Sequence, residues 1–127
     1  MSGAHGTFEV TITPQPSDDS GIGRLDLVKR WHGDLDATST GLMLSAGDPS
    51  LGHAGYVALQ LVSGKLHGLE GGFAFQQYGV MRGDARELQY GVVPGSGTGA
   101  LTGLEGTLTL TIDDDGTHTY DLDYTLE

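Results

Sequence analysis

Apolar and polar residues alternate along most of the chain, and this two-residue period is typical of half-buried strands rather than helices. Phe8, Val10 and Ile12 alternate with threonine and glutamate until Pro14. Similar alternation recurs in residues 24–32, 37–45, 56–62, 72–78, 86–93, 106–112 and 117–126. The pattern predicts an all-β chain of about eight strands with almost no helix.

Glycine-rich turn sequences separate these segments, at residues 47–50, 82–84, 94–97 and 113–116, and residues 15–23 have the composition of an exposed loop. Connections this short favour antiparallel neighbours. Eight antiparallel strands can close into a barrel that holds side chains or one small ligand. We therefore predict a single eight-stranded barrel domain over residues 1–127. Residues 64–71 and 99–106 share the pattern G-x-L-x-G-L-E-G, and we interpret both as tight hairpin bends.

Two polar residues lie in the apolar phase of their strands. Lys29 shares a face with Leu25, Leu27 and Trp31, and Gln77 shares one with Phe73 and Phe75. In a barrel these faces point inward, and buried polar groups of this kind often mark a ligand site. Tyrosines also alternate with apolar residues at two positions. The candidate ligand-binding residues are Lys29, Trp31, Phe73, Phe75, Gln77, Tyr90 and Tyr124.

Structural explanations of the same pattern remain open at this point. A β-bulge would turn Lys29 outward, a lysine at the barrel rim can extend to water, and Gln77 can satisfy a backbone group. Carboxylates give no sharper signal, since Glu70 and Glu105 lie at predicted bends and either can lean over a barrel mouth. No catalytic residue can be named from the sequence.

The composition of the chain excludes several classes of binding partner. The 127 residues include 17 acids, 6 bases and no cysteine, for a net charge of −11. Such a chain lacks the basic surface that nucleic acid or an anionic membrane requires, and it has neither disulfides nor thiolate metal sites. The first residues resemble no signal peptide, and no run approaches the roughly 18 apolar residues of a spanning helix. We expect a cytoplasmic protein.

Motifs for cofactors are present only in part. Gly95, Gly97 and Ala100 fit G-x-G-x-x-A, but no helix pattern follows, so a dinucleotide site is not expected. The acidic turn at residues 113–116 lacks the terminal acid of an EF-hand loop. The five histidines never fall at zinc-site spacings. We expect no cofactor and no metal.

Several stretches make the chain resemble a bacterial family called domain of unknown function 3224. They are WHGDL from Trp31, GKLHGLEGGFAFQQ from Gly64, VVPGSGTGALTGLEG from Val92 and the closing YDLDYTLE. The resemblance implies an eight-stranded barrel of the allene oxide cyclase-like type, often oligomeric, and it implies no reaction. Family members often carry a histidine where this chain has Gln77, so no proton-transfer role is carried over to that position.

Three functions are compatible with these observations. The first is binding of a small apolar or aromatic molecule in the lumen of the barrel. The second is a cofactor-free cyclase or isomerase acting on a polyene or enone, and the third is a structural protein whose lumen is filled by its own side chains. A homodimer is also expected, because the second faces of several strands carry apolar residues, among them Val28, Tyr56, Ala58 and Val62.

Overall fold

The computed structural model describes residues 2–16 and 21–126, and most of these residues lie in β-strands. One 3-10 turn, η1 (Pro49–Leu51), is the only helical element among these residues. The strands are β1 (Ser2–Pro14), β2 (Gly23–Gly33), β3 (Leu35–Asp48), β4 (His53–Leu66), β5 (Leu69–Arg82), β6 (Ala85–Val92), β7 (Thr98–Gly99), β8 (Glu105–Ile112) and β9 (His118–Thr125).

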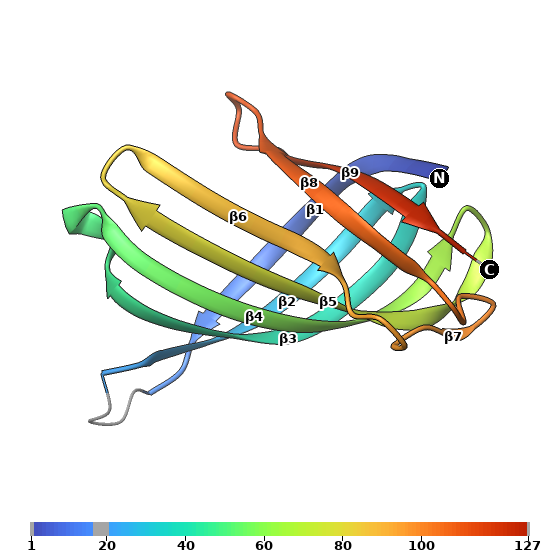
Figure 1. Ribbon diagram of the computed structural model, residues 1–127, viewed down its shortest axis with the longest axis horizontal. Helices are drawn as coiled ribbons and strands as arrows, with labels where there is room; N and C mark the ends of the chain where they lie inside the picture. Colours follow the sequence, from blue (N-terminus) through green and yellow to red (C-terminus); the bar gives the residue numbers. More distant parts are fainter. Residues whose placement is uncertain (1, 17–20, 127) are drawn as a thin grey trace.

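Eight of these strands form a closed antiparallel barrel (Figure 1). The ring runs from β1 through β2, β3, β4, β5, β6, β8 and β9 and returns to β1, while the two-residue β7 pairs with β5 outside this order. The predicted all-β class and eight-stranded barrel are confirmed. The acidic turn at residues 113–116 is the β8–β9 hairpin bend, as expected. The predicted loop at residues 15–23 falls partly, at 17–20, outside the described residues.

The barrel has one closed end and one open end. At the closed end lie the β2–β3 and β4–β5 turns and the segment of residues 93–104 (Figure 1). Leucines seal this end, and the solvent-exposed fraction of each is at most 1%: Leu35, Leu66, Leu101, Leu104 and Leu122. At the other end, luminal-phase residues such as Leu88 and Ile112 remain 42% and 61% exposed.

Residues 99–106 do not form the hairpin bend that the repeated pattern predicts. The first copy, at residues 64–71, is indeed the β4–β5 hairpin. In the second copy the chain leaves β7, inserts Leu101 and Leu104 into the core, and enters β8, which pairs with β9. Burial of the two leucines over the barrel end therefore replaces a hairpin by a plug.

Aromatic rings fill the closed half of the lumen. The Trp31 ring lies 4.6 Å from that of Phe8, 5.4 Å from that of Phe75 and 5.3 Å from that of Tyr120. The Tyr120 hydroxyl accepts a hydrogen bond from the Leu35 amide at 2.9 Å and donates to the His32 carbonyl at 3.0 Å. Aromatic ring pairs at these distances add to the stability gained from burial alone, so the rings stabilise this half of the barrel.

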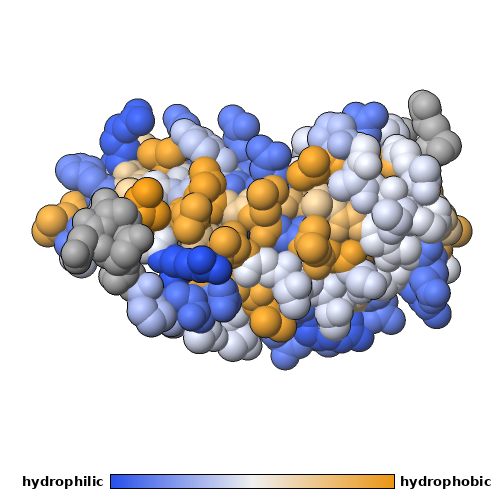
Figure 2. Space-filling view, turned by 90° about the horizontal axis from the view of Figure 1, so that it is seen from below, coloured by the Kyte–Doolittle hydropathy of each residue, from blue (hydrophilic) through white to orange (hydrophobic). Residues whose placement is uncertain are grey.

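One alternating set of apolar side chains in β4 points away from the lumen, onto the outer face formed by β3, β4 and β5. Val57, Leu59 and Leu61 are between 51% and 70% exposed, and Figure 2 shows apolar side chains gathered on the corresponding face. The sequence interpretation assigned the opposite set of β4 to the outside. Ala58 and Val62 are buried in the barrel, and only Val28 of β2, 51% exposed, points outward as expected. In β4 both alternating sets contain apolar residues, so alternation alone does not distinguish the faces.

The barrel wall is weakest between β6 and β8. Within the described residues, Gly91 and Thr107 are the one residue pair that joins these strands in the ladder. From this point toward the open end the two strands diverge (Figure 1). We call this junction the seam. No helix in the described part of the chain is long and apolar enough to cross a membrane.

Candidate functional site

Lys29 is buried in the lumen, as its phase in β2 predicts. Its side chain lies between the inward positions of Leu27 and Trp31, and only 6% of the residue is exposed. The Nζ atom donates a hydrogen bond to the Tyr90 hydroxyl at 2.9 Å. It also lies 4.7 Å from the centre of the Phe8 ring, within range of a cation–π contact. Burial lowers the pKa of Lys29 from 10.5 to about 8.

Tyr90 of β6 is the hydrogen-bond partner of Lys29 across the lumen. It projects inward from β6, and its hydroxyl accepts hydrogen bonds from both Lys29 Nζ and Gln60 Nε2, the latter at 3.0 Å. Its ring stands edge-on to Phe75 with centroids 5.1 Å apart. Burial raises the pKa of Tyr90, so its hydroxyl stays protonated at neutral pH.

Two amides and a serine extend this pair into a network across the lumen. Gln60 Nε2 lies 3.4 Å from Gln77 Oε1, and Gln77 Nε2 donates to the Tyr56 hydroxyl at 2.7 Å. On the other side, Trp31 Nε1 donates to Ser39 Oγ at 3.0 Å. Lys29, Ser39, Gln60 and Gln77 are the buried polar residues of the described chain. We call these four residues with Tyr90 the luminal network.

Glycines in the wall make room for this network. A Cβ atom on Gly41 of β3 would lie 2.8 Å from Gln60 Cγ, and one on Gly79 of β5 would lie 2.2 Å from the Tyr56 ring. Gly41 is the cross-strand partner of Gln60, and Gly79 is the cross-strand partner of Tyr56. A side chain at either glycine position would therefore overlap the space that Gln60 or Tyr56 occupies.

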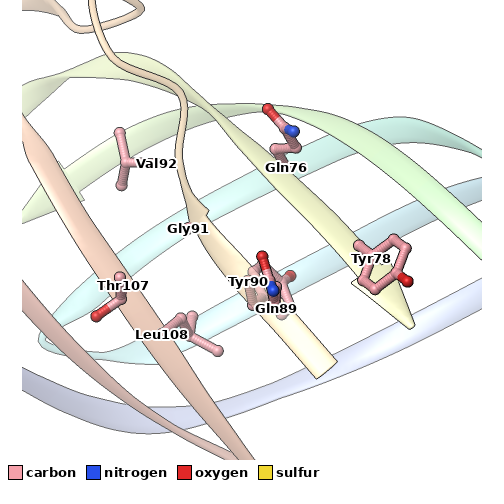
Figure 3. Close-up of a pocket in the computed structure, with 8 residues that line it drawn as sticks. All are labelled: Gln76, Tyr78, Gln89, Tyr90, Gly91, Val92, Thr107 and Leu108. Atoms are coloured by element: carbon pink, nitrogen blue, oxygen red, sulfur yellow. The ribbon is translucent and has the colours of Figure 1, made fainter. Parts of the chain in front are cut away.

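A pocket of about 440 Å³ opens at the seam next to the luminal network (Figure 3). Tyr90, Val92 and Leu108, which point inward from β6 and β8, form part of its lining. Outward residues of β5, β6 and β8 complete it: Gln76, Tyr78, Gln89 and Thr107. Inward and outward residues therefore line the same space, and Tyr90 is a member of both the luminal network and the pocket lining.

The structure brings some predicted site residues together and separates others. Lys29, Gln77 and Tyr90 belong to one network, as described above. Trp31, Phe73 and Phe75 are at most 4% exposed and pack against one another as its aromatic base. Tyr124 lies apart at the closed end, where its hydroxyl hydrogen-bonds His67 Nδ1 at 2.5 Å. Burial raises the pKa of the Tyr124 hydroxyl.

Sequence reasoning did not identify Ser39 or Gln60. Gln60 alternates with Ala58 and Val62, which is the same signal that identified Gln77. The signal was hidden because Leu59 and Leu61 form a more apolar set on the other face of β4. Ser39 alternates with Ala37 and Gly41, whose small side chains give a weak hydrophobic phase.

Exposed histidines pair with carboxylates rather than with one another. His67 Nε2 lies 3.5 Å from Asp34 Oδ2, His32 Nε2 contacts Glu9, and His5 contacts Asp121. The His5 amide also donates to Asp34, and this hydrogen bond lowers the pKa of that carboxyl. Within residues 2–16 and 21–126, no group of three His, Asp or Glu side chains is arranged to hold a metal ion.

Comparison with known proteins agrees with the barrel. No curated protein matches the chain. Among solved structures, the chain is similar to a protein with unknown function from the DUF3224 family of Shewanella oneidensis MR-1, at 41% sequence identity and a TM-score of 0.90. This match covers 100% of the present chain and 98% of the other. The family model described as "Protein of unknown function (DUF3224)" matches residues 4–124. The chain therefore belongs to the DUF3224 family.

Proposed function

We propose that the protein binds a small apolar or aromatic molecule, which enters at the seam and contacts the luminal network. One observation carries this proposal: Tyr90, whose hydroxyl accepts a hydrogen bond from the buried Lys29, also lines a pocket in the barrel wall. A purely structural barrel gains nothing from a desolvated cation, because burying an ammonium is unfavourable compared with burying an apolar side chain.

The chemistry of the lining supports a ligand of this class. Small-molecule sites are mostly apolar, with a few polar groups that fix orientation. Here Val92 and Leu108 supply apolar surface, Tyr90 supplies a hydroxyl, and Gln77 lies within the same network. Trp31, Phe73 and Phe75 hold these groups in place from the closed end. A volume of about 440 Å³ fits a molecule of one to three rings.

Binding of a neutral hydrophobic dye tests the proposal. N-phenyl-1-naphthylamine fluoresces in apolar sites, and we expect saturable binding to the wild-type protein. Thr107→Trp places a large ring at the seam pocket on an exposed position and is expected to weaken binding at least fivefold. Thr38→Trp is the matched control, because Thr38 is exposed on β3, away from the seam.

Equal dye affinity in wild-type protein and Thr107→Trp would contradict binding at the seam pocket. The outer face of β4 is the alternative dye site, and Leu61→Lys distinguishes it because Leu61 is 70% exposed there and its ladder partners, Thr40 and Ala74, do not line the seam pocket. Native mass spectrometry of freshly purified protein gives an independent measurement. We expect an added mass of a few hundred daltons that Thr107→Trp reduces.

A second candidate function is a cofactor-free isomerase of enones, and the pKa of Lys29 favours it. A group with a pKa of about 8 exists in both protonation states near neutral pH, as proton transfer requires. The protonated Tyr90 hydroxyl would stabilise an enolate oxygen. Proton exchange tests this: cyclohex-2-enone incubated in D₂O should gain deuterium faster with wild-type protein than with Lys29→Met.

A further inference from the structure

We propose that the ligand of the seam pocket is an organic acid, whose anionic oxygen accepts hydrogen bonds from Lys29 and Tyr90. Carboxylates, phenolates and sulfonates attached to an apolar body belong to this class. The inference rests on the proposed function and adds the charge of the ligand to it. Three features of the luminal network carry it: its hydrogen-bond inventory, its charge and the surroundings of the ammonium.

The network has more donors than acceptors. A lysine ammonium carries three N–H donors, and a tyrosine hydroxyl carries one. Among the described residues, Lys29 Nζ has one hydrogen-bond acceptor, the Tyr90 hydroxyl. That oxygen also accepts from Gln60, and no described residue accepts the hydroxyl proton. The unused donors are complementary to an oxygen with several lone pairs.

The charge of the lumen is also uncompensated. No described Asp or Glu is buried, and no carboxylate lies within ion-pair distance of Lys29 among residues 2–16 and 21–126. A buried charge is normally paired. The lumen of a protein with net charge −11 therefore presents one positive group, which an anionic ligand would neutralise.

Aromatic rings surround the ammonium. Lys29 Nζ lies 4.7, 5.5 and 5.2 Å from the ring centres of Phe8, Trp31 and Tyr90. Ring faces attract a cation without supplying a hydrogen-bond acceptor. The ring contacts thus offset part of the lost hydration of the ammonium, and its remaining N–H groups stay available to a ligand oxygen.

Two dyes that differ in one charged group test the proposal. Anilinonaphthalene sulfonate and N-phenyl-1-naphthylamine share the same aromatic body, and only the first carries an anion. We expect Lys29→Met to weaken binding of the sulfonate dye about tenfold or more, since a charge-assisted hydrogen bond is lost. Binding of the neutral dye should change less than twofold. Lys65→Met is the matched control, because Lys65 is the second lysine of the chain and is exposed.

A pH series on the wild-type protein gives a second measurement that needs no variant. Lys29 loses its charge as the pH rises through about 8. Affinity for the sulfonate dye should therefore fall between pH 7 and pH 9, while affinity for the neutral dye stays constant. Tyr90→Phe, which removes the other donor, should weaken the sulfonate dye alone.

The outcomes separate this inference from the proposed function. If Thr107→Trp changes the affinity of neither dye, binding at the seam pocket is wrong. If Thr107→Trp weakens both dyes, but Lys29→Met and pH do not distinguish them, the pocket binds ligands and the preference for acids is overturned. Loss of sulfonate binding in Lys65→Met, with no loss in Lys29→Met, would assign the anion to the outer surface and also overturn the inference.

Discussion

Lys29 occupies a position where the alternation of β2 places apolar side chains. Its pKa of about 8, against an ordinary 10.5, means that folding disfavours the charged form by about 3 kcal/mol. The hydrogen bond to Tyr90 and the ring contacts offset only part of the lost hydration. This unfavourable burial is what the proposed ligand contact of Lys29 would explain.

Lys29→Met should stabilise the protein at pH 7 by about 2 kcal/mol, because an apolar chain of similar length replaces a desolvated cation. Above pH 8 the folded wild-type protein releases the Lys29 proton, while the unfolded chain holds it until about pH 10.5. The unfolded state then binds more protons, so this residue makes wild-type stability rise with pH in that window. The advantage of the variant should therefore shrink between pH 8 and pH 10.5.

Urea denaturation at pH 7 and pH 10 measures this difference. Lys65→Met provides the control, since substitution of an exposed lysine should change stability little at either pH. If Lys29→Met is less stable than wild type at pH 7, or if its gain in stability grows with pH, Lys29 is not a desolvated cation in the folded protein.

Gly41 shows how tightly the network is enclosed. Its Cβ would lie 2.2 Å from the Leu59 carbonyl oxygen and 2.8 Å from Gln60 Cγ. Gly41→Ala should therefore destabilise the protein by about 1–3 kcal/mol, since the backbone of β4 has to move. Gly116→Ala is a control of a different kind, because its space is open and only its φ of +89° causes strain. Thermal unfolding compares the two, and an unchanged melting temperature for Gly41→Ala would contradict the close contact.

The candidate site was accessible to sequence reasoning only where a strand has one apolar face. Lys29 and Gln77 lie in strands whose inward residues are large and apolar, so a polar residue among them is conspicuous. Gln60 lies in a strand with apolar residues on both faces, and the choice between them depends on what covers each face. That choice is a property of the folded barrel and not of β4 alone.

At the scale of elements, one pattern of eight residues has two structures. In residues 64–71, His67 and Gly68 both have positive φ, at 47° and 80°, as a two-residue hairpin bend requires. In residues 99–106 the same glycine spacing places Leu101 and Leu104 in the barrel end. The local sequence determines where the chain can bend. Tertiary burial determines which strands meet, so strands and turns were predictable and the plug was not.

The seam should be the first part of the barrel wall to open. Within the described residues β6 and β8 share one paired position, whereas β3 and β4 pair along their full lengths. Unpaired backbone amides exchange with solvent more readily. Hydrogen-exchange mass spectrometry should show faster exchange in residues 85–90 and 108–112 than in residues 57–62. Adding a ligand of the seam pocket should slow the first two segments selectively, and uniform slowing of all strands would place the ligand elsewhere.

At the scale of the molecule, the outer face of β3, β4 and β5 combines exposed apolar residues with a centre that carries no charge, while Asp36, Lys65 and Arg82 lie toward its ends. Thr40, Leu42, Leu59 and Leu61 lie near its centre, and none of them is ionisable. A protein of net charge −11 repels its own copies over most of its surface. We propose that a second copy covers this face, because its uncharged apolar centre is where two such molecules can meet without repulsion.

Leu59→Lys should therefore dissociate the dimer. Sedimentation at micromolar concentration is expected to give about twice 13.3 kDa for wild-type protein and the monomer mass for the variant. Ile112→Lys is the control, since Ile112 is 61% exposed at the open end and lies off this face. A wild-type mass of 13.3 kDa that persists as concentration rises would contradict self-association.

The pairing of β1 with β9 has a consequence for the way the barrel folds. Every other extensively paired couple of barrel strands consists of neighbours along the chain, whereas Ser2 pairs with Tyr124 and Phe8 with His118. Ring closure therefore waits for an encounter between the first and last strands, and such distant contacts slow folding. A circular permutant that joins β9 to β1 by a short glycine linker and opens the chain at Gly103 turns this distant pairing into a hairpin. Its new ends flank the sparsely paired seam, and stopped-flow fluorescence of the single tryptophan, Trp31, should show faster folding to the same barrel.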